Sequence, residues 1–150
     1  METLTIEKNN ALKAHNEAND KGKQMLENLF GKKVFQQSII DRVQGFGDAC
    51  RELGKNQSML DFVLSGFDAY NRAQQRIETV AEALREGKPA SECFYYPYFK
   101  TGSGGFSFDG TNYDVTLSNV GARLRVDTSE KAAHLGKIML EDYKTYSTGK

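Results

Sequence analysis

Residues 94–113 read FYYPYFKTGSGGFSFDGTNY, and this stretch holds eight of the chain's aromatic residues, which number seven Tyr and nine Phe in all. Only Lys100 and Asp109 within it carry a charge. Aromatic side chains bury large areas and offer flat faces for stacking. The stretch is therefore either the main packing surface of the protein or a recognition surface, and the sequence leaves both interpretations open.

Alternating apolar and polar residues predict an antiparallel sheet in and after this stretch. Two strands are expected on either side of a turn at Asp109-Gly110; their apolar positions are Phe106, Phe108, Tyr113, Val115 and Leu117. A third alternating run follows at Ala122, Leu124 and Val126, with Arg123 and Arg125 on the opposite face. The sequence therefore predicts three antiparallel strands.

The residues before Pro89 predict helices. A first helix is expected over residues 12–30, with Gly31 as its stop. Two short helices are expected in QQSIIDRV (36–43) and GFGDACRELG (45–54), with Gly54 closing the second one. We therefore expect three to four helices in residues 1–88 once the helix described next is included.

The strongest helical pattern starts after Ser58, a good N-cap with Asp61 three residues later, and ends at Gly87 and Pro89. Its apolar residues follow steps of three and four, broken only by Gln74: Leu60, Val63, Phe67, Tyr70, Ile77, Ala81 and Leu84. This spacing predicts one long helix. Such a helix packs into a core or pairs in a two-stranded coiled coil, and both interpretations are open.

A final helix is predicted after a cap at Asp127, Thr128 or Ser129. One side of it carries Ala132, Leu135, Met139, Tyr143 and Tyr146. The expected fold is thus α+β, with a helical part over residues 1–88, a three-stranded antiparallel sheet and a C-terminal helix. We expect residues 1–150 to form a single domain, with Pro89 as the joint between subdomains 1–88 and 89–150.

The overall charge is balanced, because 20 Lys and Arg residues match 20 Asp and Glu residues. This balance argues against a generic nucleic-acid-binding protein. No signal peptide or membrane-spanning stretch is recognised, so we expect a cytoplasmic protein with no membrane partner. Cys50 and Cys93 form neither a CxxC pair nor a disulfide framework, and reduced, buried thiols are expected.

Three stretches carry a resemblance to known proteins: DRVQGFGDACRELG (41–54), FYYPYF (94–99) and SNVGARLRVDTSEKAAHLGKIMLEDYKTY (118–146). In that order they resemble a family of uncharacterised small proteins from phages, prophages and mobile elements of gut bacteria. Members carry a similar Phe-x-Asp-Ala-Cys helix, a Tyr-Tyr-Pro stretch and a Gly-x-Arg-Leu strand, and the resemblance covers about two-thirds of the chain. A longer insertion in other members is replaced here by TGSGG. The resemblance implies a bacterial host cytoplasm and no established activity.

No motif for catalysis or for a cofactor is recognised. TGSGGF and GFGDAC are rich in glycine but match neither phosphate-binding pattern. His15 and His134 lie in different predicted helices without further ligands at metal-binding spacing. We therefore predict a protein that is not an enzyme and has no metal or cofactor, although an enzyme with an unrecognised site stays open as an alternative.

The candidate binding residues are Tyr95, Tyr96, Tyr98, Phe99, Arg123 and Arg125. Pro97 excludes a regular helix among these tyrosines and favours an extended chain. Aromatic and guanidinium groups together suit a protein interface or the stacking of bases, whereas the competing interpretation places the rings in the core. Asp114 is expected to form a cross-strand ion pair with Arg123 or Arg125.

The resulting hypothesis is a non-enzymatic phage or mobile-element accessory protein. It would bind a macromolecular partner, a host or phage protein, through the aromatic stretch and the exposed faces of the long helix. The alternative is single-stranded nucleic-acid binding, with Tyr95, Tyr96 and Tyr98 stacking on bases. A homodimer is also open, because the polar first helix and the near-heptad helix both leave room for a second copy.

Overall fold

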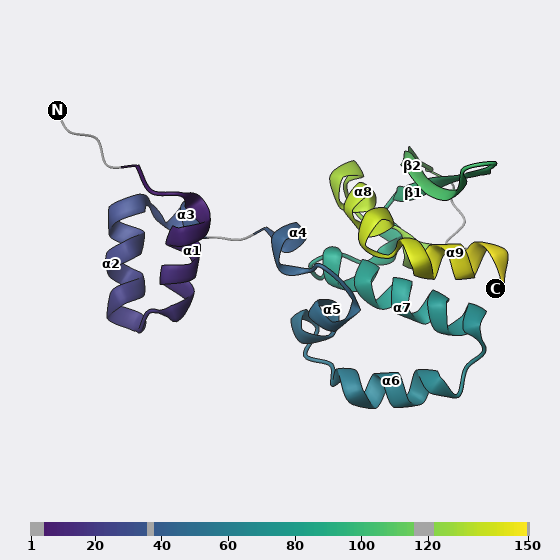
Figure 1. The fold of residues 1–150 in the computed structure, drawn as a ribbon, viewed down its shortest axis with the longest axis horizontal. Coiled ribbons are helices and arrows are strands. Elements are labelled where there is room, and N and C mark those ends of the chain that lie inside the picture. Colours follow the sequence, from purple (N-terminus) through teal and green to yellow (C-terminus); the bar gives the residue numbers. More distant parts are fainter. Residues whose placement is uncertain (1–4, 36–37, 116–121, 150) are drawn as a thin grey trace. The chain divides into compact units, whose positions relative to one another are not determined.

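A computed structural model describes residues 5–35, 38–115 and 122–149. Its contacts divide the chain into two units, Met1–Ser38 and Ile39–Lys150 (Figure 1). Each unit is described by itself below. Both helices and an antiparallel sheet are present, as the expected α+β class requires.

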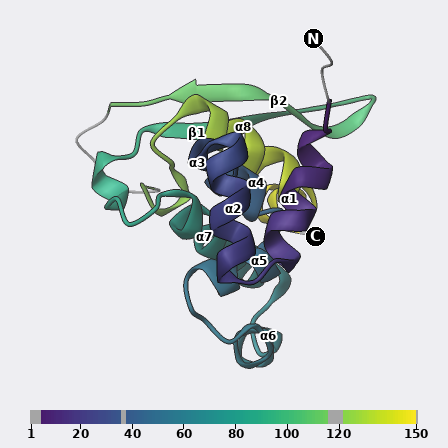
Figure 2. The ribbon, with the colours of Figure 1, turned by 90° about the vertical axis from the view of Figure 1, so that its left-hand side faces the viewer.

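The first unit contains α1 (Lys8–Glu17), α2 (Asp20–Phe30) and α3 (Lys32–Phe35), with α1 and α2 side by side (Figure 2). The prediction of one helix over residues 12–30 is wrong, because Ala18 and Asn19 are extended. The Asn19 side chain accepts a hydrogen bond from the amide of Gly22 and so starts a new helix. Gly31 ends α2 with a φ of 85°, as predicted.

His15 joins the three helices of the first unit. Its ring stacks on Phe35 of α3 with centroids 4.4 Å apart. Its Nε2 lies 3.0 Å from Oε1 of Glu27 on α2. The histidine therefore has a structural role in this small unit.

The second unit begins with α4 (Ile39–Arg42) and α5 (Phe46–Glu52), which confirms the two predicted short helices. The predicted long helix is instead two helices, α6 (Gln57–Ser65) and α7 (Ala69–Leu84). Asn56 rather than Ser58 caps α6, and the carboxylate of Asp68 caps α7 by accepting from the amide of Asn71. The apolar stripe is therefore divided between two helices.

The aromatic stretch forms a hairpin of β1 (Tyr95–Gly102) and β2 (Gly105–Tyr113), after a short 3₁₀ helix η1 (Ala90–Glu92). The prediction of a turn at Asp109-Gly110 is wrong, because the chain turns at residues 103–104 and Gly105 has a φ of 88°. Asp109 instead lies at a bulge in β2, where Tyr98 pairs with Gly110 and Phe99 pairs with Phe108.

The sheet has two strands in the described residues, so the predicted third strand is wrong. Residues 122–124 form a 3₁₀ helix, η2 (Ala122–Leu124), and Val126 makes a single antiparallel bridge with Tyr95. The guanidinium of Arg85 donates to the carbonyls of Arg123 and Arg125 at 2.9 and 3.2 Å. Those carbonyls therefore accept hydrogen bonds from a side chain and not from the backbone of a neighbouring strand. Leu117, assigned above to the second strand, lies outside the described residues.

The predicted final helix is confirmed as a helical region but is divided at Met139 into α8 (Ser129–Ile138) and α9 (Leu140–Thr148). Thr128 caps α8 by accepting from the amide of Lys131. Helix α8 packs on the hairpin and α9 packs along α7 (Figure 1). Pro89, the predicted joint, lies inside the second unit, where residues on both sides share one core.

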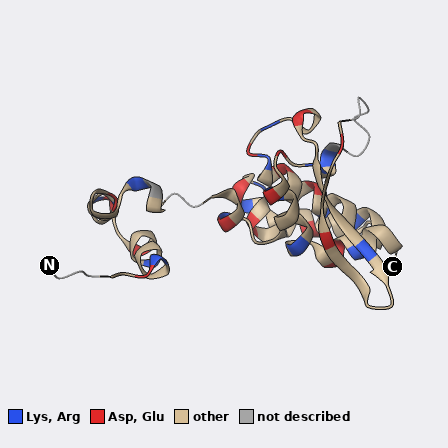
Figure 3. Cartoon of the chain, turned by 90° about the horizontal axis from the view of Figure 1, so that it is seen from above, with Lys and Arg blue, Asp and Glu red and all other residues tan. Residues whose placement is uncertain are grey.

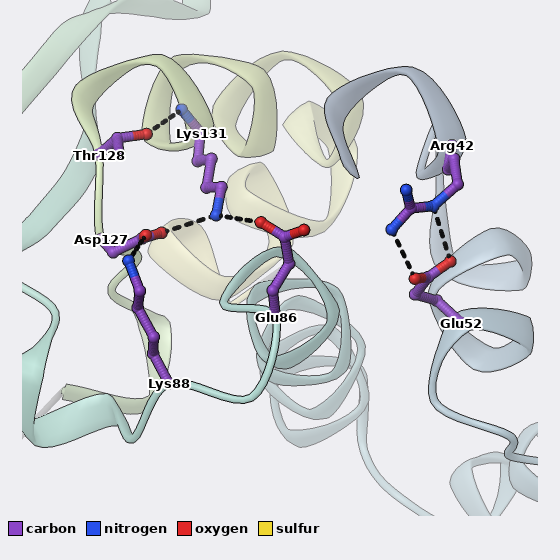
Figure 4. A network of polar contacts seen from close by, with 7 residues as sticks. All are labelled: Arg42, Glu52, Glu86, Lys88, Asp127, Thr128 and Lys131. Carbon is purple, nitrogen blue, oxygen red and sulfur yellow. Dashed lines mark hydrogen bonds and ion pairs between the residues drawn. The ribbon is translucent and has the colours of Figure 1, made fainter. Parts of the chain in front are cut away.

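A chain of ion pairs joins the end of α7 to the start of α8 (Figure 4). The ammonium of Lys131, whose side chain is 11 % exposed, lies 2.8 Å from the Glu86 carboxylate and 3.0 Å from Asp127. Lys88 also reaches Asp127, at 2.5 Å. Although burial raises the pKa of Asp127, hydrogen bonds from both lysines outweigh it and lower that pKa below its ordinary value. Burial alone would lower the pKa of Lys131. Its two carboxylate partners, Glu86 and Asp127, outweigh burial, so the pKa lies above its ordinary value.

Candidate functional site

A pocket of about 310 Å³ lies among the hairpin, η2 and α9. It is lined by residues from four separate segments of the chain: Tyr96, Pro97, Phe99, Asp114, Leu124, Arg125, Tyr143, Tyr146 and Ser147. Most of these side chains are aromatic or aliphatic. The wall therefore offers apolar contact with a small number of polar groups, which is the usual composition of a ligand pocket.

The rings of the pocket wall are held by other rings. Phe99 lies 4.6 Å from Tyr143 and 4.9 Å from Phe106 between centroids. Tyr146 stacks on Tyr70 of α7 at 5.1 Å. Such pairs fix the orientation of each ring, so the wall is largely formed before any ligand binds.

The charged group in the wall is an ion pair. Arg125 lies 3.1 Å from the carboxylate of Asp114, which confirms the predicted pairing of Asp114 with one of the two arginines. The Arg125 side chain is 11 % exposed. The hydrogen bonds from Arg85 to the carbonyls of Arg123 and Arg125 position this part of the wall.

The hydroxyl of Tyr143 is buried and lacks a hydrogen-bond partner among the described residues. The residue as a whole is 6 % exposed. Burial raises the pKa of Tyr143 far above its ordinary value, with a smaller contribution from Tyr146. Burial and a hydrogen bond with Tyr70 likewise raise the pKa of Tyr146. Both phenols are therefore protonated at neutral pH.

The structure brings three of the six predicted binding residues together, since Tyr96, Phe99 and Arg125 line the pocket. Tyr95 lies outside it, packed against Tyr113 with ring centroids 5.0 Å apart. Tyr98 is 51 % exposed. The Arg123 side chain is 78 % exposed and lies 4.0 Å from Glu78. These six residues therefore do not form one surface.

Sequence reasoning missed the part of the pocket that α9 supplies. Tyr143 and Tyr146 were assigned to one side of the final helix, which is correct, but the pattern did not place that side opposite Tyr96. Leu124 was predicted only as an apolar position of a third strand, and Ser147 gave no signal beyond ordinary composition. The packing of α9 along α7 is what brings Tyr143, Tyr146 and Ser147 to the hairpin.

A second surface of interest is the α6 face, which we define as Met59, Phe62 and Val63. These side chains are 69, 79 and 51 % exposed, and Leu64 alone is buried on this helix. The positions i, i+3 and i+4 place them on one side of the helix. Phe67 and Tyr70, each 41 % exposed, follow at the turn into α7.

The cysteines and His134 have structural surroundings that explain them. Cys50 and Cys93 are free and buried as predicted, and burial raises the pKa of both thiols. The ring of His134 lies 2.6 Å from the carbonyl oxygen of Val43. Within the described residues, no three His, Cys, Asp or Glu side chains converge as a metal site would require. None of the described helices combines the length and apolarity needed to cross a bilayer.

Comparison with protein-family models, with curated proteins and with solved structures finds no match to this chain. The candidate sites are therefore argued from their own residues.

Proposed function

We propose that this protein is a non-enzymatic accessory protein that binds a protein partner through the α6 face. The observation that supports this proposal is the exposure of Phe62, at 79 %, between two other exposed apolar side chains. Clustered apolar side chains at one surface site are typical of protein interaction sites. If the resemblance to phage and mobile-element proteins holds, the partner is a host or phage protein.

The chemistry of the α6 face favours a partner with an apolar binding surface. Asp61 is the only charged residue of α6, and it faces Arg76 at 3.8 Å. A side chain such as Phe62 contributes about 2 kcal/mol when it is fully buried. Three such side chains on one helix suit a partner with an apolar groove, because a helix presents anchors at three- and four-residue spacing.

Single-stranded nucleic-acid binding is the second candidate. The exposed ring of Tyr98 and the exposed guanidinium of Arg123 support it. Arg125, however, is paired with Asp114, and Tyr95 packs against Tyr113. Figure 3 also shows Lys and Arg residues interspersed with Asp and Glu rather than gathered on one strip. This candidate therefore ranks below protein binding.

The test places a photo-crosslinking amino acid at position 62 in the natural host, with position 103 in the exposed hairpin turn as the control. We expect one protein to be crosslinked from position 62 and not from 103, and the crosslink to be lost when Met59 is replaced by Ser. Crosslinking of a second copy of this chain would assign the face to a homodimer. Equal products from both positions would refute the proposal.

Oligonucleotide titration separates the second candidate from the first. Nucleic-acid binding that involves phosphate contacts should weaken steeply when the salt concentration rises. We expect no salt-dependent binding of a labelled single strand. Binding that is lost in Tyr98→Ser and retained in Phe62→Ser would favour nucleic acid over a protein partner.

A further inference from the structure

The two edges of the hairpin differ in what closes them. The β1 edge is closed at its start by Val126, whose backbone bonds both the N–H and the carbonyl of Tyr95, at 3.1 and 2.9 Å. Pro97, two residues later, has no N–H to offer on that edge. Proline at an edge prevents a further strand from pairing there. The sequence therefore protects β1 against an added strand.

The β2 edge carries backbone groups that have no partner among the described residues. Along a strand of an antiparallel pair, these groups point alternately toward the partner strand and away from it. Those of Tyr95 point away from β2, so alternation turns those of Phe99 and Thr101 the same way. Their partners on β2, Phe108 and Phe106, likewise direct their N–H and carbonyl groups outward. Within the part of the chain that the structure describes, nothing bonds these outward groups, and Figure 2 shows β2 as the outer strand of the hairpin.

A lysine lies beside this edge without a counter-ion. Lys137 of α8 places its Nζ 5.6 Å from the centroid of the Phe108 ring. No carboxylate of the described residues pairs with this ammonium. Residues directly opposite each other in a strand pair point to the same face of the sheet. A residue opposite Phe108 in an added strand would therefore lie on the face that Lys137 covers, and an acidic side chain there would pair with it.

The same lysine argues against a second copy of this chain as the added strand. Two β2 strands that pair about a two-fold axis at Phe108 would bring both Lys137 ammonium groups to one face of the sheet. Like charges at opposite positions destabilise a strand pair. The charge at this edge therefore favours a different chain that supplies a carboxylate.

We propose that the β2 edge binds an extended segment of a partner protein, which adds a third strand along residues 106–108 and places an acidic residue opposite Phe108, against Lys137. Main-chain hydrogen bonds to the outward groups of β2 hold the segment. The residue opposite Phe106, two positions from the acid, is apolar and packs on that ring. This site does not use the α6 face, so the failure of one proposal leaves the other standing.

The first experiment selects random heptapeptides, displayed on phage, against the immobilised full chain and against Lys137→Glu. Peptides enriched on the wild type should carry Asp or Glu two positions from an apolar residue, and those enriched on the variant should carry Lys or Arg instead. In ¹H–¹⁵N NMR, a synthetic enriched peptide should give saturable shifts at the amides of Phe106 and Phe108. Failure to enrich any peptide, an acidic preference that persists on Lys137→Glu, or shifts confined to other residues would overturn the proposal.

Two N-methylated forms of the enriched peptide separate main-chain pairing from other contacts. Methylation at the acidic residue removes an N–H that would bond Phe108, whereas methylation at the next residue removes an N–H that points away from β2. We expect the first peptide to bind about tenfold more weakly and the second to change by about twofold or less. Equal binding of the two methylated peptides would overturn the proposal.

A change of the peptide's acid to its amide isolates the ion pair. This change should weaken binding to the wild type about threefold and leave binding to Lys137→Met unaltered, because that variant has no ammonium group to lose. Equal weakening in both proteins would contradict the role of Lys137. Light scattering of the free chain tests the second copy: a dimer that the peptide dissociates would give the β2 edge to a second copy and would also overturn the proposal.

Discussion

The second unit has two apolar surfaces that differ in how they are covered. Where α8 meets the hairpin, Gly136 leaves no space for a side chain: a Cβ there would lie 2.6 Å from the Cβ of Pro97 and 2.7 Å from the Phe108 ring. On α6, by contrast, Phe62 and Met59 meet no core at all. The contact between α8 and the hairpin has no room for one further carbon atom, whereas the side chains of the α6 face are exposed. The closed contact therefore serves the fold, and the open face suits a partner.

The largest effect is expected from Gly136→Ala, which adds one methyl group to the closed contact. Alanine would favour the helix by about 1 kcal/mol, but the clash with Pro97 and Phe108 is with a ring and a strand that cannot move freely. We expect the free energy of unfolding to fall by about 3 kcal/mol in urea denaturation.

Gly47→Ala is the matched control for that substitution. Gly47 is also helical, but its added Cβ would meet only the amide end of Gln57, a flexible side chain. We expect no loss of stability and a gain of up to about 1 kcal/mol from the higher helix propensity of alanine. Equal losses at the two glycines would show that the contact under α8 has no special fit.

The next effect concerns the ion pairs that fasten α8 to α7. Lys131→Met retains most of the length of the side chain and removes its charge, which leaves Glu86 without its partner and Asp127 with Lys88 alone. We expect a loss of about 2 kcal/mol, because a buried pair is costly to break from one side.

Lys100→Met removes a surface counterpart, since Lys100 is 63 % exposed and pairs with Asp109. This control should change the free energy of unfolding by less than about 0.5 kcal/mol. A Lys131→Met variant that is as stable as this control would assign the stability of α8 to apolar packing alone.

Most of the fold follows from local signals in the sequence, and the errors occur where two signals compete. The stripe through Val63, Phe67 and Tyr70 predicted a continuous helix, yet these side chains are exposed. Its later members lie in the core: Ile77, Ala81 and Leu84. Gly66 and Asp68 mark the break as a helix end and an N-cap, but the regular spacing masked them. Apolar spacing alone does not distinguish a core from an interaction face.

The hairpin and the pocket show the second limit. The turn was placed at Asp109-Gly110, a pair that suits a turn, whereas the glycines around residue 103 form the turn and the pair lies at a bulge. For the pocket, the sequence supplied Tyr96, Phe99 and Arg125 but not Tyr143. A residue 47 positions away from Tyr96 is brought close only by tertiary packing, and no periodic pattern records that.

Acid should reduce the stability that the ion pairs of Asp127 contribute between α7 and α8. The pKa of Asp127 is lowered in the folded protein, so its contribution to stability is present above about pH 4 and is lost as the pH falls through the folded pKa. Urea denaturation at a series of pH values should show a shallower fall below pH 4 for Asp127→Asn than for the wild type.

Asp142 provides the opposite sign in the same experiment. Burial raises its pKa despite the attraction of Arg76, so its contribution is present at low pH and is lost as the pH rises through the folded pKa. Asp142→Asn should therefore steepen the fall in acid. If the free energy of unfolding changes with pH in the same way in the two variants, the opposite pKa shifts of Asp127 and Asp142 would be contradicted.

The smallest effect on stability is expected from Phe62→Ser on the α6 face. This variant can therefore test binding without a change in folding. Because the side chain is 79 % exposed and touches no core, the free energy of unfolding should change by less than about 0.5 kcal/mol, as measured by urea denaturation. Tyr98→Ser, which changes an aromatic residue of the hairpin that is 51 % exposed, is the control. Loss of partner binding in Phe62→Ser alone, at unchanged stability, would separate the two surfaces by function. A loss of several kcal/mol in Phe62→Ser would show that α6 is covered within this chain, and the contrast with α8 would then fail.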